Sequence, residues 1–325
     1  MSRVPDAGPE RPDGGPARAD GGIGQVVAAG SAGGSIYDLG YRGYRGVRLG
    51  RRHAVASLVR QSFRQCWGLG RPGRAKIVPF GLAAIATVPA VVALGVSALA
   101  SRFGAGEMME AASPIRYETY YPIVAQAVFL FAAAQAPELL ARDMRHRVLA
   151  LFFSRAIHRE DYALGKLAAL GLAMLLLVLF PQALIFVGRT LLAPDIVEAI
   201  GDDAPMLPAI IAQAVLTAGL LAALGLAVAS FTPRRAYATA AIFAAVLVPL
   251  VAVAALADLG GDLAGIASLL SPADILEGAN DFFYGQSRAG PTGADLPSVA
   301  YVGAAIAMTV IATGVLVMRY RRIEP

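Results

Sequence analysis

The stretch IVPFGLAAIATVPAVVALGVSALAS, residues 77–101, contains no Asp, Glu, Lys or Arg. It is about as long as the roughly 20 apolar residues that an α-helix needs to cross a bilayer. Five further stretches share both properties. Together they predict six membrane-spanning helices, at about 77–100, 119–141, 164–188, 206–231, 236–257 and 297–318. We therefore predict an all-α, polytopic membrane protein.

The alternative to a membrane protein is a soluble helical protein, and the amino-acid composition argues against it. Hydrophobic residues make up 57% of the chain and charged residues 16%. Helices of soluble proteins keep a polar face toward water, and six uncharged stretches in succession leave no such face. The composition therefore favours a membrane protein.

The connections between the uncharged stretches alternate in charge. Residues 36–78 carry ten basic side chains against Asp38 alone, and residues 138–166 carry six basic against four acidic side chains. The pair Arg234-Arg235 and the C-terminal tail are also basic, whereas the intervening connections are net acidic, at 102–118, 189–203 and 258–295. Basic loops stay in the cytoplasm. The pattern predicts a multi-pass protein of a bacterial plasma membrane with both termini cytoplasmic.

The segment before the first span divides into two parts. Residues 1–35 are rich in glycine and poor in bulky apolar side chains, which predicts a disordered cytoplasmic tail. Residues 36–76 form a basic juxtamembrane segment, followed by a transmembrane domain over 77–325. Interleaved tyrosine and arginine could bind RNA, but a span so close by favours contact with anionic lipid and no nucleic-acid partner.

The juxtamembrane segment contains an amphipathic pattern. Apolar residues recur at spacings of three and four over His53–Trp67, with arginines to one side. This pattern predicts an interfacial helix on the inner membrane surface, followed by a glycine-rich turn into the bilayer. The side chains that we expect at the lipid interface are Arg60, Arg64, Trp67, Arg71, Arg74 and Lys76.

Motifs for chemistry are missing from the sequence. The one Gly-Lys pair, Gly165-Lys166, has Glu160 where a P-loop needs its first glycine. The lone Cys66 supports neither an intramolecular disulfide nor a cysteine-based zinc site. We predict no catalytic, cofactor-binding or metal site on this chain. Secondary transporters normally place ionisable groups at bilayer depth; the nearest here is Glu138, which we expect to pair with Arg142.

The cytoplasmic connection 138–166 holds the apolar run Leu149–Phe153 between two charged runs. The run is too short to form a core of its own, and its two phenylalanines have no core that the sequence identifies. Exposed apolar patches mark interaction surfaces. We therefore expect this run to pack against a partner protein or the membrane face.

Several segments resemble the permease (membrane) subunits of ABC-2-type ATP-binding-cassette transporters. The segments that carry the resemblance are YDLGYRGYRGVRLGRR at 37–52, RAKIVP at 74–79, APELLARD at 136–143, VLALFFSR at 148–155 and REDYALGKL at 159–167. The likeness extends over roughly 36–325. It implies a six-helix permease, an exporter, that assembles with a second permease copy or a sibling permease.

The resemblance also implies separate ATPase subunits that bind the ATP, contacted by the loop between the second and third spans. The residues expected at this contact are Leu149, Leu151, Phe152, Phe153, Ser154, Arg155 and Arg159. The alternative is a non-transporting membrane scaffold, sensor or assembly factor. A neighbouring gene for a P-loop ATPase would favour the permease.

The charge alternation makes a testable prediction about topology. Cysteines introduced by Asp202→Cys and Gly285→Cys should react from outside the cell with a membrane-impermeant thiol reagent, because both lie in acidic connections. A cysteine introduced by Arg159→Cys should not react. Labelling of this last variant in intact cells would overturn the predicted topology.

Overall fold

The computed structural model describes residues 46, 49–103, 117–154, 157–259, 263–285 and 296–322. The chain divides into two units, Met1–Val47 and Arg48–Pro325. Only Gly46 of the first unit is described, so the predicted tail over 1–35 lies outside the described residues.

The described residues form helices and no strand. The elements are α1 (Gly50–Cys66), α2 (Arg74–Arg102), α4 (Tyr117–Arg145), α5 (Leu149–Phe153), α6 (Arg159–Leu192), α7 (Ile196–Asp203), the 3₁₀ turn η1 (Ala204–Met206), α8 (Leu207–Ala229), α9 (Arg235–Leu259), α10 (Leu263–Ser268), α11 (Pro272–Tyr284) and α12 (Ser298–Arg321). Six segments of this part of the chain are long and apolar enough to cross a membrane: α2, α4, α6, α7 to α8, α9 and α12. The predicted all-α class with six spans is confirmed.

The helices run beyond the uncharged stretches that predicted them. The span predicted to begin at 164 belongs to α6, which begins at Arg159 and continues to Leu192. Arg, Lys and Glu are good helix formers. A charged residue therefore ends the part of the helix that fits the bilayer without ending the helix itself.

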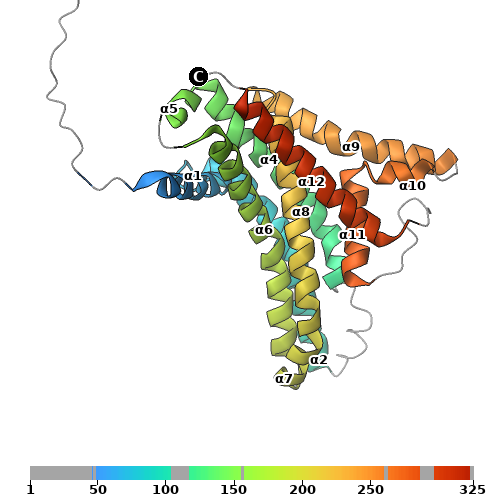
Figure 1. The fold of residues 1–325 in the computed structure, drawn as a ribbon. Helices are drawn as coiled ribbons and strands as arrows, with labels where there is room; N and C mark the ends of the chain where they lie inside the picture. Colours follow the sequence, from blue (N-terminus) through green and yellow to red (C-terminus); the bar gives the residue numbers. More distant parts are fainter. Residues whose placement is uncertain are drawn as a thin grey trace, which may run out of the picture. The chain divides into compact units, whose positions relative to one another are not determined.

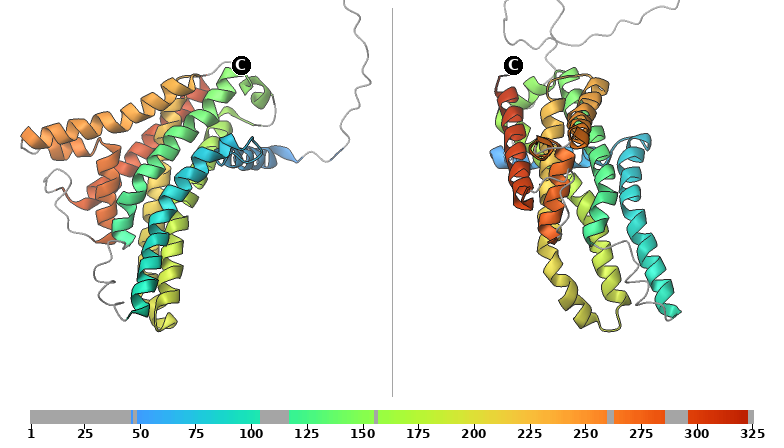
Figure 2. Two further views of the ribbon diagram at one scale, coloured as in Figure 1. Left: turned by 180° about the vertical axis from the view of Figure 1, so that it is seen from behind. Right: turned by 90° about the vertical axis from the view of Figure 1, so that its right-hand side faces the viewer.

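Two ends of the helix bundle can be distinguished (Figure 1). The start of α2, the helix α5, the connection from α8 to α9 and the end of α12 lie together at one end, which we call the α5 end. The end of α2 and the helix α7 lie at the opposite, α7 end (Figure 2). Helix α9 leans away from α6 and α8, and α10 turns back beside it.

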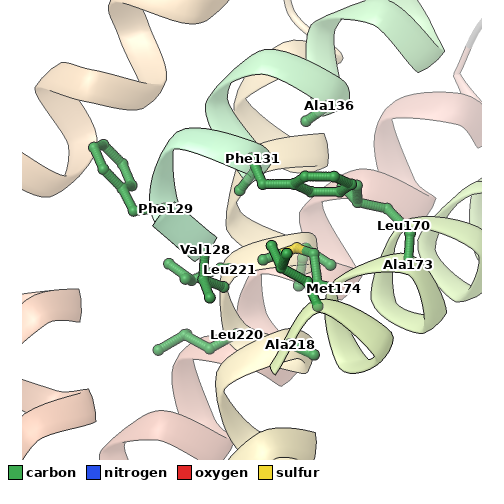
Figure 3. Close-up of a cluster of buried hydrophobic side chains, with 14 of the residues drawn as sticks. Val128, Phe129, Phe131, Ala136, Leu170, Ala173, Met174, Ala218, Leu220 and Leu221 are labelled. Atoms are coloured by element: carbon green, nitrogen blue, oxygen red, sulfur yellow. The ribbon is translucent and has the colours of Figure 1, made fainter. Parts of the chain in front are cut away.

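The core lies where α4, α6 and α8 meet (Figure 3). Phe131 of α4 points toward Leu170 of α6, and Met174 lies beside Ala218 and Leu221 of α8. All five side chains are buried. Lipid offers no hydrophobic drive for helix association, so close packing of alanine-rich faces stabilises such an interface.

The long connection 258–295 holds two short helices, α10 and α11, as its apolar run and proline predict. Pro272 is the first residue of α11. The N–H that proline lacks has no partner within the helix at this position, so proline is well tolerated there. Ser271 caps α11 and accepts a hydrogen bond from the backbone N–H of Asp274. Burial raises the pKa of the Asp274 carboxyl above its ordinary value.

Helix α1 confirms the predicted amphipathic helix, but its apolar face contacts protein. Leu58 is buried against α6, where Gly165 leaves no side chain in its way. Arg51 donates two hydrogen bonds of 2.7 Å to the carboxylate of Asp161. Part of the apolar face predicted for the membrane surface therefore packs against the bundle instead. The three-and-four spacing indicates that a helix buries one face, but not what covers that face.

Two of the six expected lipid-interface residues contact other parts of the protein. Trp67 is only 8% exposed, and its ring packs between Phe80 and Phe131 with centroid distances of 5.6 and 5.4 Å. Arg71 donates a hydrogen bond of 2.6 Å to Glu138. For Trp67 the prediction is wrong, because protein encloses its ring, whereas Arg71 is half-buried and bonded to α4. The other four side chains are exposed: Arg60, Arg64, Arg74 and Lys76.

The turn from α1 into α2 is built on Gly68. The N–H of Leu69 bonds the carbonyl of Arg64 and the N–H of Gly68 bonds that of Gln65, which is a Schellman motif. Gly68 has φ +64°, a left-handed conformation that glycine adopts without penalty. A Cβ there would also lie 2.6 Å from the carbonyl oxygen of Ala75.

The native thiol does not interfere with cysteine labelling. Cys66 is fully buried, and burial raises the pKa of its thiol to about 12. A thiol reacts as the thiolate, so Cys66 stays unreactive at neutral pH. The topology variants can therefore be read in the native background.

The α1–α2 turn predicts a difference between two glycine substitutions. Gly70 also has a left-handed φ, +80°, but no atom lies within 4 Å of the position of a Cβ. Gly70→Ala should cost about 1–2 kcal/mol of stability from conformation alone. Gly68→Ala should cost clearly more, because the clash with Ala75 adds to the same penalty. Thermal unfolding of the purified variants in detergent measures the difference, and equal melting temperatures would contradict it.

Candidate functional site at the α5 end

Helix α4 ends in a strained corner that leads into α5. Arg147 has φ +52°, a conformation that costs a non-glycine residue about 1–2 kcal/mol. The N–H of Val148 bonds the carbonyl of Asp143 and the N–H of Arg147 bonds that of Met144. These are the two bonds of a Schellman motif, so α4 is properly capped despite the strain. The corner redirects the chain into α5, a helix of five residues.

Helix α5 is seated on the bundle by its aromatic residues. The rings of Phe152 and Phe153 lie 5.4 and 6.1 Å from the ring of Tyr162, centroid to centroid. Both phenylalanines are half-buried and pack against the main core. The expectation that they have no core to join is therefore wrong. On the outer side of α5, Leu151 is 65% exposed, so this helix still presents an apolar side chain outward.

Beneath α5, four side chains connect three spans. Asp143 lies in the last turn of α4, Tyr162 and Lys166 lie one turn apart on α6, and Tyr320 lies near the end of α12; we call them the Asp143 cluster. The carboxylate of Asp143 accepts a hydrogen bond of 2.7 Å from the Tyr162 hydroxyl and pairs with the Lys166 ammonium at 2.8 Å. The rings of Tyr162 and Tyr320 are 5.1 Å apart.

The Asp143 cluster is electrostatically fragile. The side chain of Lys166 is 2% exposed, and Asp143 is its one ion-pair partner among the described residues. The Lys166 ammonium also lies 5.4 Å from the centre of the Tyr162 ring, within cation–π range. A buried ion pair adds little stability by itself, but removing one partner leaves a costly unpaired charge. The cluster therefore holds α4 and α6 in one arrangement.

The first turn of α6 joins the end of α12. Arg321 pairs with Glu160 at 2.7 Å, and Arg159 donates a hydrogen bond of 3.0 Å to the backbone carbonyl of Arg321. The Arg159 guanidinium also lies 5.7 Å from the ring of Phe153 on α5. These groups line a groove of about 560 Å³ between α5 and the ends of α6 and α12.

Glu138 forms a different ion pair from the one expected. It lies 2.6 Å from Arg71 before α2 and 3.2 Å from Arg235 at the start of α9, whereas Arg142 is exposed. A pairing four residues along the same helix is only weakly favourable. Contacts with Arg71 and Arg235 replace it, and they tie α4 to the turn before α2 and to the start of α9.

The structure brings most of the expected ATPase-contact residues together. Leu149, Leu151, Phe152 and Phe153 form α5, Ser154 follows it with an exposed side chain, and Arg159 begins α6 beside it. Arg155 lies outside the described residues. Sequence reasoning missed the Asp143 cluster. A signal was available, because Lys166 lies inside an apolar helix and shares a face with Tyr162 at a spacing of four.

No protein-family model matches this sequence, and no curated protein matches it.

The Asp143 cluster predicts the stability of three variants. Asp143→Asn should lower stability by about 3–5 kcal/mol, because it leaves the Lys166 ammonium buried without a countercharge. The double variant Asp143→Asn/Lys166→Met should recover most of that loss, since an apolar side chain needs no partner. Thermal unfolding in detergent provides the measurement.

Asp195→Asn is the matched control for the removal of a carboxylate. Asp195 caps α7 at the other end of the bundle, and Asn caps helices about as well as Asp. This control should therefore melt like the unsubstituted protein. If the double variant were no more stable than Asp143→Asn alone, Asp143 would not stabilise the protein by neutralising the buried charge of Lys166.

Proposed function

We propose that this protein is the permease subunit of an ABC-2-type transporter, an exporter, and that α5 with its flanking residues contacts a separate ATPase subunit. ATP is bound and hydrolysed on that partner. A second permease copy or a sibling permease completes the transmembrane pathway. The proposal also places the protein in a bacterial plasma membrane with the α5 end and both termini in the cytoplasm.

The observation that carries the proposal is the position of α5. It is a short helix at the end of the bundle, and its outward side chain Leu151 is apolar and 65% exposed. Charged residues surround it, among them Arg147 and Arg159. A small apolar contact ringed by charge is the composition of a protein–protein interface with a few dominant residues.

The contacts beneath α5 support a route for coupling. Displacement of α5 would move Phe152 and Phe153 against Tyr162, and Tyr162 touches both Asp143 of α4 and Tyr320 of α12. An ATPase that pulls on α5 would therefore bias the packing of α4, α6 and α12 together. Packed interfaces respond to such a bias by switching between arrangements rather than by deforming smoothly.

Leu151→Glu tests the ATPase contact without disturbing the core. Phe152→Ala and Phe153→Ala should also weaken ATPase binding, but they remove contacts with Tyr162 as well, so the exposed Leu151 is the cleaner position. Loss of an interface residue worth about 2 kcal/mol should weaken the complex about 30-fold. The measurements are co-purification with a co-expressed candidate P-loop ATPase and ATP hydrolysis in proteoliposomes.

Val197→Glu is the matched control, because Val197 is an 80% exposed apolar residue on α7. It should leave both readouts unchanged. If Leu151→Glu retained full ATPase binding and hydrolysis at normal abundance in the membrane, the proposed contact would be wrong and a scaffold or sensor would be favoured.

A further inference from the structure

A wide groove opens on the bundle surface between α2, α4 and α9. Its volume is about 1170 Å³, which exceeds the roughly 300–1,000 Å³ of ordinary small-molecule sites. Its walls are apolar side chains of these three helices: Val78, Leu82, Leu130, Ala133, Ala134, Ala240 and Phe243. Val78 and Leu130 are exposed along it, so the groove is open from the side.

Three arginines line one end of this groove, with no carboxylate among its lining residues. Arg145 comes from the end of α4, and Arg234 and Arg235 from the start of α9. Arg235 pairs with Glu138 at 3.2 Å. Among the described residues, Arg145 and Arg234 have no ion-pair partner; the Arg234 guanidinium lies 5.6 Å from the ring of Tyr237.

The position of these arginines is unfavourable for the helix itself. The N-terminus of a helix carries a partial positive charge and free N–H groups, so cations are normally avoided there. Helix α9 begins with Arg235, directly after Arg234, and both lie beside Arg145 in the groove. Glu138 compensates Arg235, whereas Arg145 and Arg234 keep a local conflict of the kind expected where a bound group compensates it. The compensating group must carry negative charge.

The depth of the groove indicates what else that group contains. Along α9, Phe243 lies eight residues beyond Arg235, which corresponds to about 12 Å of helix. Half of the hydrocarbon core of a bilayer is about 15 Å thick. The groove thus extends over about one leaflet, with its basic rim at the α5 end of the spans and its apolar floor toward the middle.

We propose that this groove binds an anionic phospholipid from the leaflet at the α5 end. The phosphate-bearing headgroup contacts Arg145 and Arg234, and one acyl chain lies along the apolar wall toward Phe243. Basic pockets between spans on the cytoplasmic side favour anionic headgroups in this way. A lipid site requires only that these helices span a membrane, so it does not depend on the proposed transport function.

Native mass spectrometry of the purified full chain tests the site, using phosphatidylglycerol and phosphatidylcholine at equal concentration. The unsubstituted protein should retain phosphatidylglycerol in clear preference. Arg145→Gln/Arg234→Gln should bind it about 25-fold more weakly, taking about fivefold for each arginine. Arg235 is left in place because it also holds Glu138. The matched control Arg142→Gln/Arg322→Gln removes two exposed arginines that do not line the groove, one near the end of α4 and one directly after α12, and should bind like the unsubstituted protein.

A second pair of variants tests the apolar wall without changing any charge. Ala240 is exposed and lines the groove, so Ala240→Phe should fill it and reduce lipid retention. Ala241→Phe, at the exposed neighbouring position that does not line the groove, should not. Both substitutions lie on the outer surface and leave the core untouched, so each variant should fold.

Three results would overturn the proposal. The first is equal retention of the two lipids, which would show that the headgroup charge is not recognised, or an equal loss in both double-glutamine variants, which would indicate attraction to charge in general. The second is displacement of phosphatidylglycerol by inorganic phosphate at the same concentration, which would indicate a simple anion site. The third is a dimer that Ala240→Phe dissociates, because the groove would then be covered by a second copy of this chain.

Discussion

The ion pair between Lys166 and Asp143 is the constraint on which the α5 end of the structure depends. An ammonium group that is 2% exposed must have a countercharge, and the residue that supplies it belongs to another helix. The pair therefore fixes the end of α4 against the first turns of α6. Tyr162 bonds the same carboxylate and touches Tyr320, so α12 joins the same arrangement. With the helices held in this arrangement, their alanine-rich faces pack closely toward the α7 end of the bundle.

Helix α5 combines attachment to the bundle with an exposed apolar surface. A loop with an exposed apolar patch but no contacts with the spans could move without displacing them, so it would transmit little motion to the bundle. Here Phe152 and Phe153 rest on a tyrosine that is itself bonded into the Asp143 cluster. The strained conformation of Arg147 holds the corner from which α5 departs. Helix α5 is therefore firmly attached to the bundle through its aromatic rings while it exposes an apolar side chain.

The sequence predicts the spans well and the contacts between them poorly, for a physical reason. A membrane crossing requires a local property, an uncharged apolar run of sufficient length, and each of the six runs can be read without knowledge of the others. Glu138 shows the contrary case. Its nearest partner in sequence, Arg142, is exposed, whereas its actual partners are Arg71 and Arg235. Trp67 likewise looked suited to the interface, but it packs between Phe80 and Phe131. Which surface covers an apolar or charged side chain is decided by tertiary packing.

The basic residues of this chain are almost all arginine, and its two lysines, Lys76 and Lys166, lie in opposite environments. Lys166 is enclosed and paired, while Lys76 is exposed in the first turn of α2. An acylating reagent must reach the amine, and the side chain of Lys166 is too deeply buried to be reached. Amine-directed chemistry on the folded protein therefore distinguishes the two lysine side chains. A fluorophore or tether can be attached through Lys76, where α1 turns into α2, without altering the sequence.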